Sequence, residues 1–106
     1  MWRDDNDEIE KLWNHFITKA ERYPCICPIC GRTSAHVYLH RYRGEKGSAW
    51  MWCSACKNCS YGTVAIPKWW SDDDFIDLGK TASHPDYLEC EKTFIDNYVN
   101  NILNNL

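Results

Sequence analysis

The chain has 106 residues, including seven cysteines and six tryptophans, and its formal net charge is −3 at pH 7. This length predicts a single domain, residues 1–106, whose core is small enough to benefit from a bound metal. No apolar run approaches the ~20 residues of a membrane-spanning helix, and residues 1–5 lead into acidic sequence rather than a secretory signal, so we expect a cytoplasmic protein with no membrane partner.

The charge is distributed unevenly along the chain. Residues 22–68 carry seven Lys and Arg against one acidic residue, whereas residues 1–21 have a net charge of −3 and residues 69–106 a net charge of −6. A zinc ion bound by four thiolates would add about −2 to the central segment. A moderately basic centre between acidic ends is not typical of a strong nucleic-acid binder and favours a protein partner.

Residues 5–23 are predicted to form an amphipathic helix. Asp5 or Asn6 can cap its first turn, and Pro24 ends it. Its apolar side chains follow the spacing of one helical face: Ile9, Leu12, Trp13, Phe16, Ile17 and Ala20. Faces this regular usually belong to the core, so we expect this one to pack on the rest of the domain.

Six of the seven cysteines lie in two short clusters, with 22 cysteine-free residues between Cys30 and Cys53. The clusters read Cys25-Ile-Cys27-Pro-Ile-Cys30-Gly31 and Cys53-Ser-Ala-Cys56-Lys-Asn-Cys59. Two Cys-x-x-Cys pairs at this separation indicate a metal site in a reducing compartment. We predict one structural Zn²⁺ with four thiolate ligands and no open coordination position: Cys27, Cys30, Cys53 and Cys56.

Cys25 and Cys59 leave alternatives open. Either residue could take part in a shifted four-ligand site, or both could belong to a cluster with more than four cysteines. Cys53-x-x-Cys56-x-x-Cys59 also resembles part of an iron–sulfur motif, but the fourth cysteine followed by proline is missing. The spacing alone therefore assigns no role to Cys25 or Cys59.

Residues 25–67 predict a zinc ribbon of three antiparallel strands, at 35–42, 49–52 and 61–66, within an α+β fold that has a helix at each end. The first strand alternates, with Val37 and Leu39 on one face. The other face carries aromatic and histidine side chains: His36, Tyr38, His40 and Tyr42. We expect Tyr38, Tyr42 and the neighbouring Arg43 to be exposed for binding a partner.

Residues 68–79 combine two tryptophans with an acidic run. Because exposed tryptophans are enriched in protein interfaces and acidic side chains suit a basic partner, this segment is a second candidate surface. Its candidate binding residues are Trp69, Trp70, Asp72, Asp73, Asp74 and Asp77. A last helix is expected at 85–104, with Pro85 as its first residue.

The candidate chemistry favours a binding protein over an enzyme. A nucleophilic cysteine needs a histidine base in contact with it, and no spacing in the sequence indicates such a pair. Nucleic-acid binding is the main alternative, because the Tyr38 and Tyr42 face beside Arg43 mixes aromatic rings with positive charge. The aspartates of residues 72–77 would repel phosphate, which favours the protein partner.

The chain resembles a family of small bacterial zinc-ribbon proteins that are encoded beside polymorphic or contact-dependent toxins and act as their immunity proteins. The resemblance covers roughly residues 24–104 and lies in four segments: Cys27-Pro-Ile-Cys30-Gly31, His36-Val-Tyr-Leu-His-Arg-Tyr42, Trp50-Met-Trp52-Cys53-Ser-Ala-Cys56 and Ile66-Pro-Lys-Trp69-Trp70. It implies a protein that binds one cognate toxin domain and blocks its active site or substrate path. It does not identify the activity of that toxin.

Overall fold

A four-stranded antiparallel sheet with strand order β1-β2-β3-β4 forms the middle layer of the fold. The computed structural model describes residues 2–4, 7–73 and 75–106. The strands are β1 (Cys25–Ile26), β2 (Thr33–Arg43), β3 (Lys46–Cys53) and β4 (Cys59–Ala65). The α+β class is confirmed, and the three expected strands overlap β2, β3 and β4. The expectation of a three-stranded ribbon is wrong, because the first two residues of the first cysteine cluster form a fourth strand that pairs with β2, with Cys25 opposite Ala35.

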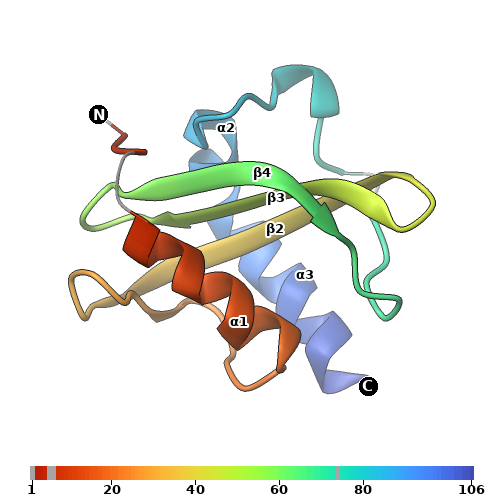
Figure 1. The fold of residues 1–106 in the computed structure, drawn as a ribbon, viewed down its shortest axis with the longest axis horizontal. Coiled ribbons are helices and arrows are strands. Elements are labelled where there is room, and N and C mark those ends of the chain that lie inside the picture. Colours follow the sequence, from red (N-terminus) through yellow and green to blue (C-terminus); the bar gives the residue numbers. More distant parts are fainter. Residues whose placement is uncertain (1, 5–6, 74) are drawn as a thin grey trace.

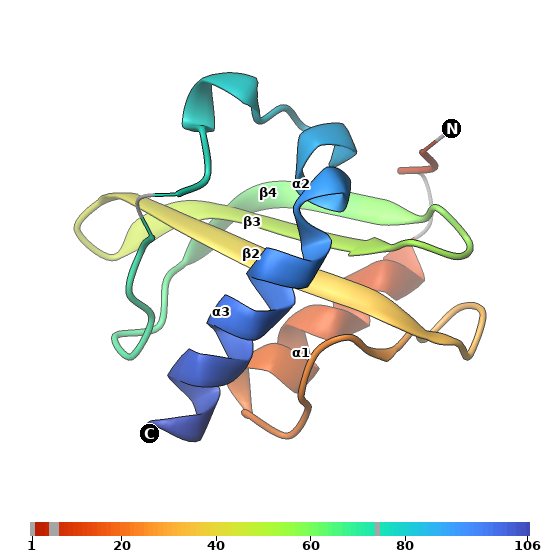
Figure 2. The same cartoon turned by 180° about the vertical axis from the view of Figure 1, so that it is seen from behind.

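Helices cover both faces of this sheet. The 3₁₀ helix η1 (Asp7–Glu10) and α1 (Lys11–Ile17) lie on one face (Figure 1), while α2 (Asp86–Cys90) and α3 (Lys92–Asn104) lie on the other (Figure 2). Alternation along β2 directs Val37 and Leu39 toward α1, and His36 and Tyr38 toward α3. The middle of the sheet, at β2 and β3, is therefore buried on both faces, which the alternating pattern of β2 did not reveal.

The first helix is shorter than the sequence predicts. Its apolar residues Ile9, Leu12 and Phe16 are fully buried, as expected for a core face. The α-helix ends at Ile17 rather than near residue 23, because Lys19 adopts a left-handed conformation with φ of 59° and turns the chain back toward the sheet. The proposed caps, Asp5 and Asn6, lie outside the described residues.

The C-terminal helix is divided into two segments. Glu91, with φ of −100° and ψ of 14°, interrupts the predicted helix at 85–104 between α2 and α3. Leu88 of α2 and Ile95 of α3 are both buried, so the break lets each segment turn its apolar side toward the sheet. Pro85 precedes the first segment, and the short 3₁₀ helix η2 (Leu78–Lys80) lies between this region and the acidic run.

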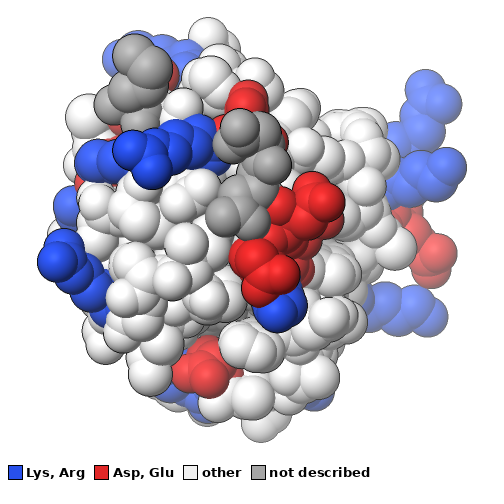
Figure 3. Space-filling view, turned by 60° about the vertical axis from the view of Figure 1, so that its left-hand side comes forward, with Lys and Arg blue, Asp and Glu red and all other residues white. Residues whose placement is uncertain are grey.

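The surface is mixed in charge. On the face drawn in Figure 3, acidic side chains gather near the centre, and basic side chains lie both beside them and at the right-hand edge. This face has no continuous basic surface of the kind that tracks a nucleic-acid backbone. Within the described part of the chain, no helix has the length and apolar composition needed to span a membrane.

Candidate metal centre

The four predicted cysteines meet at one end of the sheet. Their Sγ atoms all lie within 4.8 Å of one another, and Cys27–Cys56 and Cys30–Cys53 are each 3.7 Å apart. Zinc–thiolate bonds of about 2.3 Å in a tetrahedron place the sulfurs ~3.8 Å apart. The donor set therefore fits one metal ion and is compatible with zinc.

Two matching turns build the site. In each turn the backbone carbonyl of the first cysteine accepts a hydrogen bond from the backbone N–H of the residue four positions later. Gly31 N donates to Cys27 O and Lys57 N donates to Cys53 O, both at 3.0 Å. The residue after the second cysteine is left-handed in both, with φ of 76° at Gly31 and 65° at Lys57. Glycine accommodates this conformation without strain, whereas lysine does not.

Hydrogen bonds reach the sulfur atoms of the site, and they favour the thiolate most at Cys53, whereas burial raises the pKa of Cys27 to about 12. Ile29 N donates to Cys27 Sγ at 3.3 Å, and Asn58 Nδ2 donates to Cys56 Sγ at 3.2 Å. Burial would raise the pKa of Cys53, but the Ser34 hydroxyl at 3.0 Å and the amides of the turn outweigh it and lower that pKa to about 7. A thiolate stabilised in this way is the form that binds a metal.

Cys25 and Cys59 are not part of the four-sulfur group. Both are about 2% exposed, and each lies in a strand of the sheet. Burial raises the pKa of Cys25 to about 12 and that of Cys59 to about 11. They are therefore buried neutral thiols that pack in the core, a role that the spacing of the cysteines left open.

Trp70, in the predicted binding segment at residues 68–79, points into the core. Trp70 is only 2% exposed and its indole Nε1 donates to Asp72 at 2.9 Å, so the expectation that it anchors a partner is wrong. Its ring packs edge-on against Tyr38, which is 1% exposed and also cannot meet a partner. The physical reason is that Trp70 and α3 close over the strand face that carries Tyr38.

The acidic run also serves the fold. Asp72 accepts from the backbone N–H of Arg41 at 3.0 Å, and Asp73 accepts from the Tyr38 hydroxyl at 2.8 Å. Asp73 also accepts from the amides of residues 75 and 76, and Asp77 accepts from Gly79 N. Asp74 lies outside the described residues. Asp72 and Asp73 thus have partners within the domain, although Asp72 and Asp77 remain exposed.

The exposed candidates are fewer and differ in part from those predicted. Tyr42 is 56% exposed and Arg43 is exposed beside it, at the hairpin between β2 and β3, while Trp69 is half-buried against Phe16. The most exposed large apolar side chain among the described residues is Phe75, at 75%, stacked edge-on against the partly exposed Phe94. Neither phenylalanine was singled out from the sequence.

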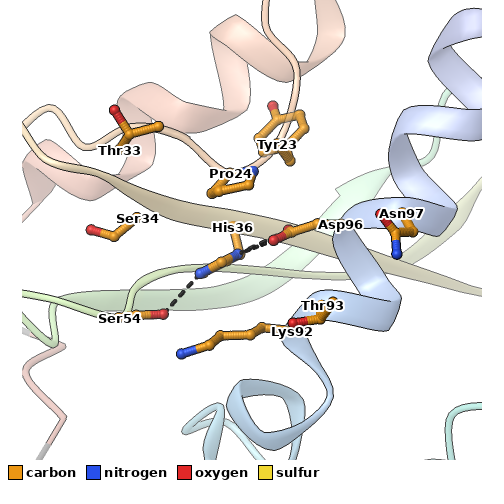
Figure 4. A pocket seen from close by; sticks show the side chains of 10 residues that line it. All are labelled: Tyr23, Pro24, Thr33, Ser34, His36, Ser54, Lys92, Thr93, Asp96 and Asn97. Carbon is orange, nitrogen blue, oxygen red and sulfur yellow. Dashed lines mark hydrogen bonds and ion pairs between the residues drawn. The ribbon is translucent and has the colours of Figure 1, made fainter.

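A buried histidine connects the sheet to α3 and to the second cysteine turn. His36 Nδ1 lies 2.9 Å from both carboxylate oxygens of Asp96, and Nε2 lies 2.8 Å from the Ser54 hydroxyl (Figure 4). Ser54 donates to Glu89 Oε1 at 2.7 Å. His36 thus has a hydrogen-bond partner at each of its two ring nitrogens.

Glu89 is the other end of this network. It accepts from Trp52 Nε1 at 3.0 Å and from Lys92 Nζ at 2.8 Å, besides Ser54. Burial would raise the pKa of Glu89, but these hydrogen bonds outweigh it, and the pKa is lowered from its ordinary value. Because Ser54 follows the metal-site residue Cys53 directly, the network holds α2 and α3 against the metal end of the sheet.

Ser54, His36 and Asp96 have the order of contacts of a hydrolytic triad and line an open cleft of about 340 Å³. Two contacts argue against that role. The Ser54 hydroxyl donates its one proton to Glu89 Oε1, so it has none directed at His36 as a nucleophile would. The Ser54 N–H donates to Ser34 O at 2.9 Å and is not free to stabilise an oxyanion. The geometry favours a structural role, in which these residues hold α2 and α3 against the sheet.

Comparison of the chain with protein-family models, curated proteins and solved structures finds no match. The function must therefore be argued from the residues and the geometry. The four metal-site cysteines were predictable from their spacing. The His36–Asp96 pair was not, because its two members are 60 positions apart and neither belongs to a recognisable motif.

Proposed function

We propose that this chain is a non-enzymatic protein-binding module, an immunity protein that neutralises a cognate toxin domain by direct binding. The metal is a single structural Zn²⁺ held by the four thiolates. Four protein ligands leave no coordination position for water or substrate, so the ion serves folding rather than chemistry. Metal analysis tests this part: one zinc per chain supports it, and a coloured, iron-containing protein contradicts it.

The observation that carries the binding function is the exposure of Phe75. An aromatic side chain that is 75% exposed and stacked on Phe94 provides the kind of apolar anchor that dominates protein interfaces. Leu78, 43% exposed, begins η2 three residues later, and Asp77 is exposed between them in the sequence. We call Phe75, Asp77, Leu78 and Phe94 the Phe75 surface.

The charge of this region indicates the kind of partner. Residues 69–106 have a net charge of −6, and Asp77 belongs to that segment. An apolar anchor in an acidic environment suits a basic surface, such as the nucleic-acid-binding cleft of a toxin nuclease. In this proposal the acidic residues accelerate association, and the phenylalanines limit dissociation.

Co-purification with the product of the neighbouring toxin gene tests the proposal. The variant Phe75→Ala should weaken the complex about tenfold or more, as expected for an interface hot spot. Leu106→Ala is the matched control, because Leu106 is also exposed, at 59%, but lies at the C-terminus outside the Phe75 surface. Equal affinities of the two variants would contradict the assignment of this surface.

Nucleic-acid binding remains the second candidate because of the β2–β3 hairpin. Tyr42 and Arg43 are exposed there, and Lys46 begins the next strand. Failure to capture a toxin, together with salt-dependent binding of RNA or DNA that Arg43→Ala weakens, would favour this alternative. Under the immunity proposal, Arg43→Ala should weaken the toxin complex less than Phe75→Ala does.

A further inference from the structure

Residues 2–4 lie across the end of the second cysteine turn, and we call them the N-terminal strap. Arg3 N donates to Lys57 O, and Arg3 O accepts from Cys59 N, both at 2.7 Å. Arg3 thereby forms a parallel bridge with Asn58, the residue between these two partners. Figures 1 and 2 both show the strap beside the loop that leads into β4. The backbone of the strap therefore fixes the chain on both sides of Asn58.

The side chains of the strap attach it to the start of α2. Trp2 Nε1 donates to Asp86 Oδ1 at 2.7 Å, and the half-buried indole packs against the core. Asp4 Oδ2 lies 2.8 Å from His84 Nε2, and both of these side chains are exposed. The strap therefore joins the second cysteine turn to α2 through contacts that lie largely at the surface.

Asn58 connects the strap to the metal ligands. It is 5% exposed, and its Nδ2 donates to Cys56 Sγ at 3.2 Å. Its carbonyl oxygen accepts from Cys53 N at 3.0 Å. One residue thus contacts both ligands of the second turn, and Arg3 binds the peptide groups on either side of it. Detachment of Arg3 would therefore free Asn58 and, with it, the two cysteines.

Lys57 makes the second turn more dependent on outside contacts than the first. At the equivalent position of the first turn, Gly31 adopts a left-handed φ without strain, whereas Lys57 has a φ of 65° that is unfavourable for a residue with a Cβ. The Lys57 side chain is also the one that meets the strap, because its Nζ lies 5.0 Å from the centroid of the Trp2 ring. The residue that strains the turn therefore also attaches the turn to the strap.

We propose that the N-terminal strap holds the second cysteine turn closed and thereby sets the rate at which the site releases its metal. Detachment of the strap lets Cys53 and Cys56 move apart from the other two ligands, Cys27 and Cys30, which keep their own turn. This local opening requires no unfolding of the core, because the strap contacts lie largely at the surface. The inference rests on the proposed zinc occupancy of the site and not on the proposed toxin binding.

Transfer of zinc from the zinc-loaded protein to a chromogenic chelator, followed in time, tests the proposal. The rate is read at chelator concentrations so high that it no longer depends on them, because it then reports the opening of the site. Trp2→Ala removes the bond to Asp86 and the ring beside Lys57, and it should accelerate release about tenfold or more. Tyr42→Ala, which removes an exposed aromatic ring at the β2–β3 hairpin, is the matched control and should release zinc at the wild-type rate.

Alkylation of the cysteines during release separates local opening from a general loss of stability. In Trp2→Ala, Cys53 and Cys56 should be alkylated faster than in the wild type, whereas Cys25, which is 2% exposed, should stay protected. Alkylation of Cys25 in step with Cys53 would mean that the whole domain unfolds, and this result overturns the proposal. A Trp2→Ala protein that releases zinc at the wild-type rate overturns it as well.

Two further variants keep the test decisive if Trp2→Ala folds poorly. Trp2→Phe loses the bond to Asp86 but keeps a ring beside Lys57, so it should release zinc faster than the wild type by a smaller factor. Lys57→Gly removes both the strain and the contact with Trp2, so Trp2→Phe should accelerate release less in that background. Equal acceleration in both backgrounds contradicts the proposed coupling. A wild type that neither retains nor takes up zinc contradicts the metal site and, with it, this role of the strap.

Discussion

A comparison of Cys30→Ser with Cys90→Ser should separate the contribution of metal binding to stability from that of side-chain packing. Cys30 and Cys90 are both exposed, so neither Cys30→Ser nor Cys90→Ser removes a buried side chain from the core. Cys30 belongs to the four-sulfur group, whereas Cys90 ends α2 and lies outside that group. Any large difference between the two variants therefore reports the metal site.

The expected difference is large. Structural zinc sites have apparent binding free energies of about 10–16 kcal/mol, and whole domains have stabilities of only about 5–15 kcal/mol. Loss of one of four ligands should therefore lower the free energy of unfolding of Cys30→Ser by at least ~3 kcal/mol or prevent folding. Cys90→Ser should remain within about 0.5 kcal/mol of the wild type, as exposed substitutions usually do.

Urea unfolding followed by tryptophan fluorescence measures both variants, because Trp50 and Trp52 lie in the central strand β3. Zinc content measured on the same samples links stability to metal. The reasoning is refuted if Cys30→Ser unfolds at the wild-type midpoint, or if both variants lose stability equally. A Cys30→Ser protein that is folded and free of zinc would leave the site with no structural role.

Three further predictions concern the surroundings of the site. Gly31→Ala should destabilise the protein by about 1 kcal/mol, since a left-handed φ of 76° is unfavourable for alanine; Gly62→Ala, where an added Cβ likewise meets nothing within 4 Å, is the control and should not destabilise in urea. Because the pKa of Glu89 is lowered by folding, its contribution to stability is present above its ordinary value of 4.5 and is lost as the pH falls through the lowered value. The stability difference between wild type and Glu89→Gln should thus be greatest near neutral pH and shrink in acid. Finally, a fluorophosphonate probe should leave Ser54 unlabelled, and labelling that His36→Ala abolishes would show that Ser54 is a nucleophile after all.

A feature could be predicted from the sequence when the residues that form it lie close together along the chain. The cysteine turns are local, and a five-residue motif specifies both the ligand spacing and the left-handed position at Gly31. The strands were also predictable, because alternation is a local property of β2. The end of the first helix was not, because Lys19 gives no signal that it adopts a left-handed turn.

The errors at the predicted binding surface have one common cause. Alternation shows that Tyr38 and Val37 lie on opposite faces of β2, but it does not show whether one or both faces are covered. Here α3 covers the second face, and Tyr38 is buried instead of exposed. Trp70 is buried for the same reason, and Asp73 bonds to Tyr38 within the domain rather than facing a partner.

The buried network shows how a short chain supports a sheet with two covered faces. The cysteine group joins the turn that precedes β2 to the end of β3 and the turn that follows it. Ser54 links this group to the C-terminal helices, because it follows Cys53 in the chain and bonds to both His36 and Glu89. A metal that fixes the second cysteine turn therefore also fixes the position of the Ser54 hydroxyl. Docking of the C-terminal helices and metal binding are thus expected to be one cooperative event, because both depend on the Ser54 hydroxyl and its bonds to His36 and Glu89.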